Sequence, residues 1–310
     1  MKISYSAPAK TILSGEHAVV YGKPALISAL NLRLKFTVRE EEVKVKDKTI
    51  AMIDELVKKH LGEKKIAYTD KKFAYKIDSE IPIGQNLGSS AALSVAASAA
   101  LLEFYTGKQF SKDEINSVAY EIEKYFHGKP SGGDNSASCF GGLIYFRKEF
   151  EFLKNISALN IKIPQKINDA LYIIDSGKSQ EKTSELVKKV GELYNHNPKN
   201  IEEILNDIEK VTKHMVLSIN QESVDSFKEC IGKNELLLEQ LSVVSDKTKK
   251  LIVTLSKYGV GKVTGAGGIS QGSGNLLFFA DQPKELEEFL KIEKISYLKF
   301  IQDFEGVRRE

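Results

Sequence analysis

The chain has 310 residues, of which 42% are hydrophobic and 28% are charged. A chain of this length and composition can bury a large core, which excludes a disordered protein and predicts about two domains. Its 45 lysines and arginines nearly balance its 42 aspartates and glutamates, so the net charge of +3 gives no argument for binding nucleic acid or an anionic membrane.

The cysteines and the start of the chain bear on the compartment. Cys139 and Cys230 lie far apart and outside any Cys-x-x-Cys pair, which favours two free buried thiols over a single bridge. Residues 1–8 lack the apolar core of a signal peptide, and the longest weakly polar run, 91–102, is too short to span a membrane. We therefore expect a soluble cytoplasmic protein, and a homodimer stays open.

The first half of the chain is rich in strand signals. Hydrophobic and polar residues alternate over 26–38 and again over 73–77, which predicts two half-buried strands. A turn-rich stretch at 81–90 predicts a loop that leads into an alanine-rich helix over 91–104.

A second helix is predicted from its own end signals. Ser111 and Glu114 have the spacing of a capping box, so a helix is expected over 111–126. Gly128 and Pro130 follow it and are typical of a helix end.

The second half is predicted to be mostly helical. Amphipathic patterns predict helices over 183–194, 201–219, 224–241, 246–258 and 283–290. Short apolar runs predict strands at 141–146, 170–174 and 276–279. The change from strand-rich to helix-rich sequence between 150 and 165 predicts two domains, 1–160 and 161–310.

The strongest local signal is the glycine-rich loop Gly84-x-x-x-Gly88-Ser89-Ser90 in front of the predicted helix. Backbone N–H groups of such a turn can converge on one point, and the following helix adds its unsatisfied N–H groups and positive dipole end. These features suit a phosphate, and the two hydroxyls could bind phosphate oxygens or Mg²⁺. The alternative is a loop followed by an ordinary N-cap serine, and the loop alone leaves both open.

Other phosphate-binding patterns are missing. Gly177-Lys178-Ser179 resembles the end of a Walker A motif, but Tyr172 stands where that motif needs its first glycine. We also find no dinucleotide fingerprint after the first strand and no protein-kinase signature. A second glycine cluster, Thr264-Gly265-Ala266-Gly267-Gly268, would alone fit a tight turn. Its glycines would let a second stretch of backbone come close to a ligand, so a ligand could lie between the two clusters.

Three polar clusters could surround such a ligand. They are Lys10 with Glu16 and His17, Glu123 with His127, and the segment 130–135 with Asp134. Taken singly, each has a plainer interpretation: a strand-edge lysine, a solvated helix face and an aspartate that caps a turn. Together they supply what phosphoryl transfer requires, namely a phosphate cradle, Mg²⁺ ligands, a cation and a carboxylate that orients the attacking hydroxyl. Since a carboxylate is a weak base at pH 7, the lysine could lower the pKa of the hydroxyl instead.

The segments 82–92, 127–135 and 264–268 resemble the three motifs of the GHMP small-molecule kinases, and the segments 15–22 and 127–135 are most similar to the mevalonate kinase branch. The resemblance implies a two-domain α+β fold with the active site in the interdomain cleft. It implies transfer of the γ-phosphoryl group of ATP to the C5 hydroxyl of mevalonate in isoprenoid biosynthesis. ATP and Mg²⁺ would be the cofactors, and mevalonate the small-molecule partner.

The resemblance also implies a role for each motif residue. Asp134 would be the catalytic carboxylate, Lys10 would stabilise the developing alkoxide, and Ser90 with Glu123 would hold Mg²⁺. The ATP phosphates would be bound by Pro82, Gly84, Gln85, Asn86, Leu87, Gly88, Ser89 and Ser90. The substrate pocket would be lined by Glu16, His17, Gly265, Ala266 and, after a one-residue gap in the motif, Thr183.

Two departures from the family pattern stand out. The third motif continues as Ile269-Ser270 where the family has further glycines, and Gln85-Asn86 stand where small residues are common. The alternatives are another GHMP kinase, such as a mevalonate 3-kinase or a phosphomevalonate kinase, and a non-catalytic ligand-sensing homologue. The presence of both Asp134 and Lys10 disfavours the last.

Overall fold

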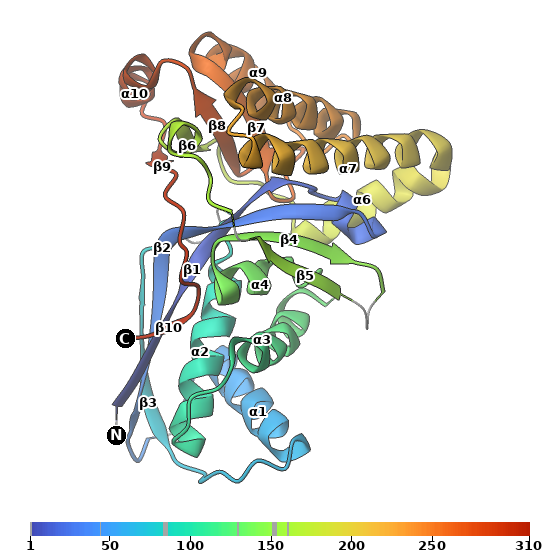
Figure 1. Cartoon of the computed structure of the whole chain (residues 1–310). Helices are drawn as coiled ribbons and strands as arrows, with labels where there is room; N and C mark the ends of the chain where they lie inside the picture. Colours follow the sequence, from blue (N-terminus) through green and yellow to red (C-terminus); the bar gives the residue numbers. More distant parts are fainter. Residues whose placement is uncertain (1, 44, 83–85, 129, 151–153, 160) are drawn as a thin grey trace.

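The protein is described by a computed structural model that covers residues 2–43, 45–82, 86–128, 130–150, 154–159 and 161–310. Within these residues the chain folds into two antiparallel sheets with helices packed on them (Figure 1). The first sheet has the order β10-β1-β2-β4-β5, with β3 paired to β2, and the second has the order β7-β8-β6-β9. This arrangement confirms the predicted α+β class.

The first sheet is built on a long pairing of β1 with β2. Its strands are β1 (Lys2–Ser14), β2 (Pro24–Glu40), β3 (Phe73–Ser79), β4 (Leu143–Lys148), β5 (Lys154–Leu159) and β10 (Arg308–Arg309). The β1–β2 register shifts between Pro8 and Ala9. A proline has no N–H for the ladder, so strands commonly break register at such a residue. The shift lies just before Lys10.

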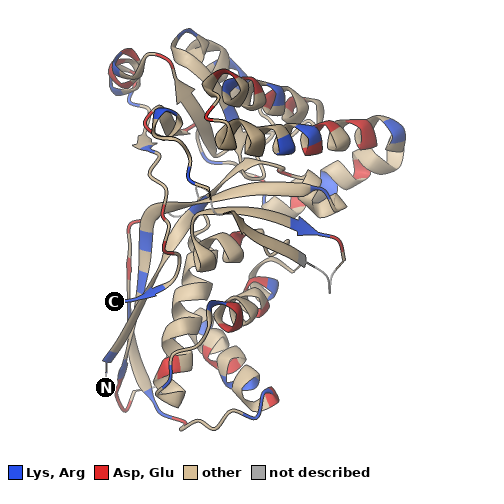
Figure 2. Ribbon diagram, in the orientation of Figure 1, with Lys and Arg blue, Asp and Glu red and all other residues tan. Residues whose placement is uncertain are grey.

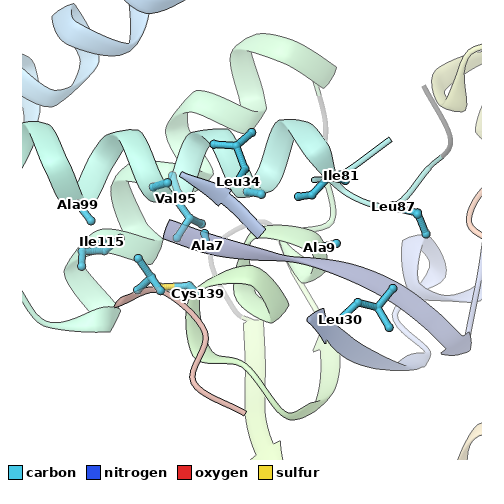
Figure 3. Close-up of a cluster of buried hydrophobic side chains, with 14 of the residues drawn as sticks. Ala7, Ala9, Leu30, Leu34, Ile81, Leu87, Val95, Ala99, Ile115 and Cys139 are labelled. Carbon is cyan, nitrogen blue, oxygen red and sulfur yellow. The ribbon is translucent and has the colours of Figure 1, made fainter. Parts of the chain in front are cut away.

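Helices cover one face of this sheet (Figure 1). They are α1 (Lys48–Glu63), α2 (Ser89–Thr106), α3 (Lys112–His127) and α4 (Gly133–Phe140). α2 is buried almost all round, as expected of a helix that is apolar on every side. The small Ala7 of β1 lies beside Val95 of α2 and allows a close approach (Figure 3).

The second sheet carries the remaining long helices. Its strands are β6 (Leu171–Asp175), β7 (Gly259–Thr264), β8 (Asn275–Ala280) and β9 (Tyr297–Lys299). The helices of this part are α5 (Gln165–Asn168), α6 (Thr183–His196), α7 (Pro198–Asn220), α8 (Val224–Gln240), α9 (Asp246–Leu255) and α10 (Pro283–Ile292). Short 3-10 turns are η1 (Ala18–Tyr21) and η2 (Ser256–Tyr258). Figure 2 shows charges of both signs interspersed along α6 and α7 and a mostly uncharged α2.

Polar and apolar contacts join the two sheets. Thr264 Oγ1 of β7 lies 2.9 Å from Thr11 Oγ1 of β1 and accepts a hydrogen bond from the backbone N–H of Ile12 at 3.1 Å. One hydrophobic cluster contains residues of both halves, such as Leu30 and Phe227. β10 follows the second sheet in the chain but pairs with β1 in the first. The division into domains 1–160 and 161–310 therefore stays a prediction.

The predicted elements are found with small changes at their ends, and local signals account for them. Ser111 caps α3 and forms a capping box with Glu114, and Gly128 ends the helix with a positive φ of 71°. The segment 130–135 was expected to be a loop, but α4 begins inside it, at Gly133. The helix α1 was not predicted at all.

Two expectations about the chain's environment can be compared with the structure. Cys139 and Cys230 are free and buried, which confirms the preference for two thiols over a bridge. Among the residues that the structure describes, every helix is too short or too polar to cross a membrane.

Candidate active site

The first glycine loop brings the start of α2 onto Lys10. Gly88 is the N-cap of α2 and has a left-handed φ of 77°. A Cβ added at Gly88 would lie 2.8 Å from Lys10 Cγ, and the N–H of Lys10 donates to the carbonyl of Leu87 at 2.9 Å. Ser89 and Ser90 form the first turn of the helix and are half-buried. The helix therefore presents its positive end beside a buried lysine.

The rest of this loop faces the second glycine cluster. Pro82 and Asn86 are both half-buried. A Cβ at Gly265 would lie 3.2 Å from Asn86 Cβ, and a Cβ at Gly274 would lie 2.9 Å from Asn86 Nδ2. Asn86, one of the two departures from the family pattern, thus occupies the space that side chains at Gly265 and Gly274 would need. Two predicted phosphate-binding residues lie outside the described part of the chain: Gly84 and Gln85.

Lys10 and Asp134 form an ion pair, with Nζ of the lysine 3.0 Å from Oδ2 of the aspartate. The Lys10 side chain is 5% exposed, so the plainer interpretation of a strand-edge lysine does not account for its position. Asp134 lies in the first turn of α4, where the helix dipole favours a negative charge, and its side chain is 40% exposed. Solvent and small molecules can therefore reach the carboxylate.

Glu123 of α3 is buried close to this pair, which contradicts the interpretation of a solvated helix face. Its Oε1 accepts a hydrogen bond from Ser94 Oγ at 2.9 Å, and its Oε2 lies 3.5 Å from His127 Nε2. Burial, followed by the negative charge of Asp134, raises the pKa of Glu123 to about 7. His127 Nε2 is also 3.2 Å from Ser90 Oγ, so the imidazole faces both predicted metal ligands.

The donor chemistry of Ser90 and Glu123 fits Mg²⁺. A hydroxyl and a carboxylate are hard oxygen ligands, and a buried carboxylate with a raised pKa is stabilised by a nearby cation. Among the described residues no group of three or more His, Cys, Asp or Glu side chains could hold a metal ion. In phosphoryl transfer Mg²⁺ is typically bound through one or two carboxylates and the phosphates of the substrate.

The predicted pocket residues Glu16, His17 and Ala266 also converge. His17 Nε2 lies 3.0 Å from the carbonyl oxygen of Ala266 and must donate, since a carbonyl only accepts. Burial lowers the pKa of His17, which favours the neutral imidazole. Glu16 is buried and forms an ion pair with Lys262 of β7. Lys262 was not singled out in the sequence.

Ile269 and Ser270, the other departure from the family pattern, are hydrogen-bonded to Glu181. The carboxylate accepts hydrogen bonds from the N–H of Ile269 at 3.1 Å, from the N–H of Ser270 at 2.9 Å and from the Ser270 hydroxyl. Burial raises the pKa of Glu181, but these hydrogen bonds outweigh burial and lower it to about 2. The carboxylate therefore fastens this part of the glycine loop.

The chain is similar to a known family of kinases. Residues 48–142 match the family model of the GHMP kinases N terminal domain. The mevalonate kinase of Archaeoglobus fulgidus is 32% identical over 297 residues, which cover 90% of this chain and 93% of that protein. The chain belongs to the mevalonate kinase family. This confirms the family resemblance of the motifs.

Solved structures of mevalonate kinases share the fold. The Methanococcus jannaschii mevalonate kinase superimposes with a TM-score of 0.77 at 24% identity, covering 97% of this chain and 98% of that one. The L. major mevalonate kinase, solved in complex with R-mevalonate, gives a TM-score of 0.73 at 20% identity, covering 96% of each chain. The GHMP kinase fold predicted from the sequence is confirmed.

For one predicted residue of this mevalonate kinase family member, Thr183, the role in the site stays a prediction. Thr183 is exposed at the start of α6, and no hydrogen bond or ion pair found among the described residues joins it to Lys10 or Asp134. Conversely, His127 was named in a polar cluster without a role of its own, and Lys262 was not singled out. A histidine four residues after Glu123 on the same helix face was a usable signal, whereas a lysine within a strand was not.

Proposed function

We propose that the protein is a mevalonate kinase, which transfers the γ-phosphoryl group of ATP to the C5 hydroxyl of mevalonate and forms 5-phosphomevalonate in isoprenoid biosynthesis. The family relatives support the reaction. The observation that carries the proposal is the Lys10–Asp134 ion pair, 3.0 Å long, beside the N-terminus of α2. A cation, a reachable carboxylate and a phosphate-binding helix end are the parts that phosphoryl transfer to an alcohol needs.

Lys10 and Asp134 would act on the acceptor hydroxyl. Asp134 would orient the hydroxyl and accept its proton late, because an ordinary carboxylate is too weak a base to remove it early. Lys10 would stabilise the developing alkoxide. Its side chain is covered by protein, and a charge acts more strongly in such a place than in water.

The nucleotide would bind on the first glycine loop. The backbone N–H groups of residues 86–90 and the positive end of α2 suit its phosphates. Ser90 and Glu123 would hold Mg²⁺, which neutralises phosphate charge when it is bound. Asn86, packed against Gly265, would set how closely the nucleotide loop approaches the second glycine cluster.

The acceptor pocket would be formed by Glu16, His17, Gly265 and Ala266, with Thr183 at its border. Since His17 Nε2 donates to Ala266, its Nδ1 is left as an acceptor for a substrate hydroxyl.

The cytoplasm would be the site of action. Two free buried thiols agree with a reducing compartment.

A panel of acceptors tests the proposal. The purified protein is supplied with Mg²⁺ and ATP, and ADP formation is coupled to a reporter reaction for mevalonate, phosphomevalonate, homoserine and galactose. We expect the highest kcat/KM with mevalonate, and ³¹P NMR of the product should place the phosphate on C5. A faster reaction with another acceptor, or a phosphate on C3, would point to another GHMP kinase. Acceptor binding without turnover would point to the ligand-sensing homologue.

A further inference from the structure

Lys262 is a fully buried charge behind the proposed acceptor pocket. Its side chain is 0% exposed and that of its ion-pair partner Glu16 is 1% exposed. Lys262 belongs to β7, and Glu16 belongs to the turn that follows β1. An isolated charge in such a place is very costly, so the two groups depend on each other.

A second buried carboxylate lies close to the same ammonium. Oε2 of Glu235, on α8, accepts a hydrogen bond from the N–H of Val263 at 2.7 Å. Burial raises the pKa of both Glu16 and Glu235, and the positive charge of Lys262 partly opposes this rise. Among the described residues, Oε1 of Glu235 and Oε2 of Glu16 have no hydrogen-bond partner. One ammonium therefore lies near two carboxyl groups, and each of these has one oxygen without a hydrogen-bond partner among the described residues.

Glu16, Lys262 and Glu235 form a row of ionisable groups with the Lys10–Asp134 pair. Asp134 pairs with Lys10, Lys10 lies close enough to favour the charged form of Glu16, and Glu16 pairs with Lys262. Acidic and basic residues therefore alternate along this row, from the partly exposed Asp134 to the buried Glu235. Neutralising one member changes the field at its neighbours, because charges interact strongly where water is excluded.

The turn that carries Glu16 is held from both sides. A Cβ at Gly15 would lie 2.4 Å from the carbonyl oxygen of Pro24, so this side of the turn is packed against the β2 backbone. On the other side, His17 bonds to Ala266 and Glu16 to Lys262. Lys262 thus ties the Glu16–His17 turn to the strand that leads into the second glycine cluster.

We propose that Lys262 is a positioning residue for acceptor binding: it pairs with Glu16 and fixes the turn 15–17 so that His17 faces the acceptor. The proposal rests on the proposed function, since it assigns the pocket to mevalonate. A lysine with a purely structural role would hold the two halves together without affecting which substrate is bound.

Two variants separate these roles. Lys262→Met keeps most of the length of the side chain and leaves Glu16 without its partner. The double variant Glu16→Gln with Lys262→Met removes both charges, and such a replacement of a buried pair is often tolerated. Lys233→Met is the matched control, because Lys233 forms an exposed i, i+4 pair with Glu229. Melting temperature, kcat and the KM values for mevalonate and ATP are measured for each.

We expect Lys262→Met to raise the KM for mevalonate by at least about tenfold while the KM for ATP changes less than about twofold. The double variant should regain the melting temperature and keep the high KM for mevalonate. The proposal is overturned if folded Lys262→Met binds mevalonate normally, or if the double variant regains both stability and a normal KM.

The design also covers failure of the single variant or of the enzyme assignment. If Lys262→Met does not fold, the double variant decides alone by its KM for mevalonate. Wild-type protein that does not phosphorylate mevalonate overturns the proposed function and this inference together. Normal wild-type turnover with an unchanged KM in the variants overturns only the inference.

Discussion

The ammonium of Lys10 lies 3.0 Å from the carboxylate of Asp134, although one residue belongs to the middle of β1 and the other to the first turn of α4. The lysine is buried and the aspartate is partly open to solvent. This asymmetry gives the two residues different roles. The buried partner sets the electrostatic field, and the open one meets the substrate.

Replacing Asp134 by asparagine should lower kcat by at least about a hundredfold, because the variant keeps the shape of the side chain and loses the proton acceptor. ATP binding should change little, since Asp134 is not part of the predicted nucleotide loop. Steady-state kinetics and a direct ATP titration measure both. Near-normal turnover in this variant would refute the assignment of Asp134.

Replacing Ser90 by alanine should act through Mg-ATP. The variant removes one predicted metal ligand, so the KM for Mg-ATP should rise by about tenfold and more Mg²⁺ should be needed for half-maximal rate. Ser98→Ala is the matched control, since Ser98 lies in the same helix and its buried hydroxyl has no hydrogen-bond partner among the described residues. A change confined to the KM for mevalonate would contradict the metal-ligand role.

Gly88→Ala should damage activity as well as stability. The left-handed φ of 77° disfavours any side chain, and a Cβ there would lie 2.8 Å from Lys10 Cγ. Gly107, at the other end of α2, has a similar φ of 71° and nothing within 4 Å of an added Cβ. Both variants should lose about 1–2 kcal/mol of unfolding free energy from backbone strain, measured by urea denaturation. Only Gly88→Ala should lose turnover, and equal activities would contradict the contact.

The stability of the protein should depend on pH through Glu235. Burial raises the pKa of this carboxyl from 4.5 to about 7, so the folded protein holds a proton there that the unfolded chain has released between these two values. Unfolding free energy from this group is therefore highest below pH 4.5 and decreases as the pH rises towards 7. Glu235→Gln keeps an acceptor for the N–H of Val263 and removes the titration.

Urea denaturation at pH 5 and pH 8 checks this dependence. The stability of Glu235→Gln relative to the wild type should improve from the lower to the higher pH. The same difference at both pH values would show that Glu235 keeps an ordinary pKa. The comparison between variant and wild type cancels the titration of the other groups.

Local signals were sufficient for much of the fold. Alternation predicted β2, and the capping pattern at Ser111 and Glu114 predicted α3 to within one residue at each end. The segment containing Asp134 was less clear, because glycines around it are typical of turns and gave no sign that α4 begins at Gly133. End signals are read reliably only where the residues at the end have strong preferences.

Less of the candidate site than of the fold could be predicted from the sequence. The motifs predicted that Lys10 and Asp134 would meet, and they do. They gave no indication of Lys262, because its burial depends on Glu16 and on α8, which are distant in sequence. The sequence showed departures at Asn86 and Ser270, but not that Asn86 packs against Gly265 or that Ser270 is hydrogen-bonded to Glu181. Pairings of this kind follow from the tertiary structure alone.

The pairing of β10 with β1 has a consequence for splitting the protein. Arg309 donates to Glu103 of α2, and Glu103 also accepts from the Tyr5 hydroxyl at 2.6 Å. If the chain were expressed as two fragments divided between β5 and α5, the second fragment would carry a strand and an arginine that belong to the sheet of the first. Neither fragment could then complete its own hydrogen bonding, so the two would reassemble as partners of a split enzyme rather than work as independent modules.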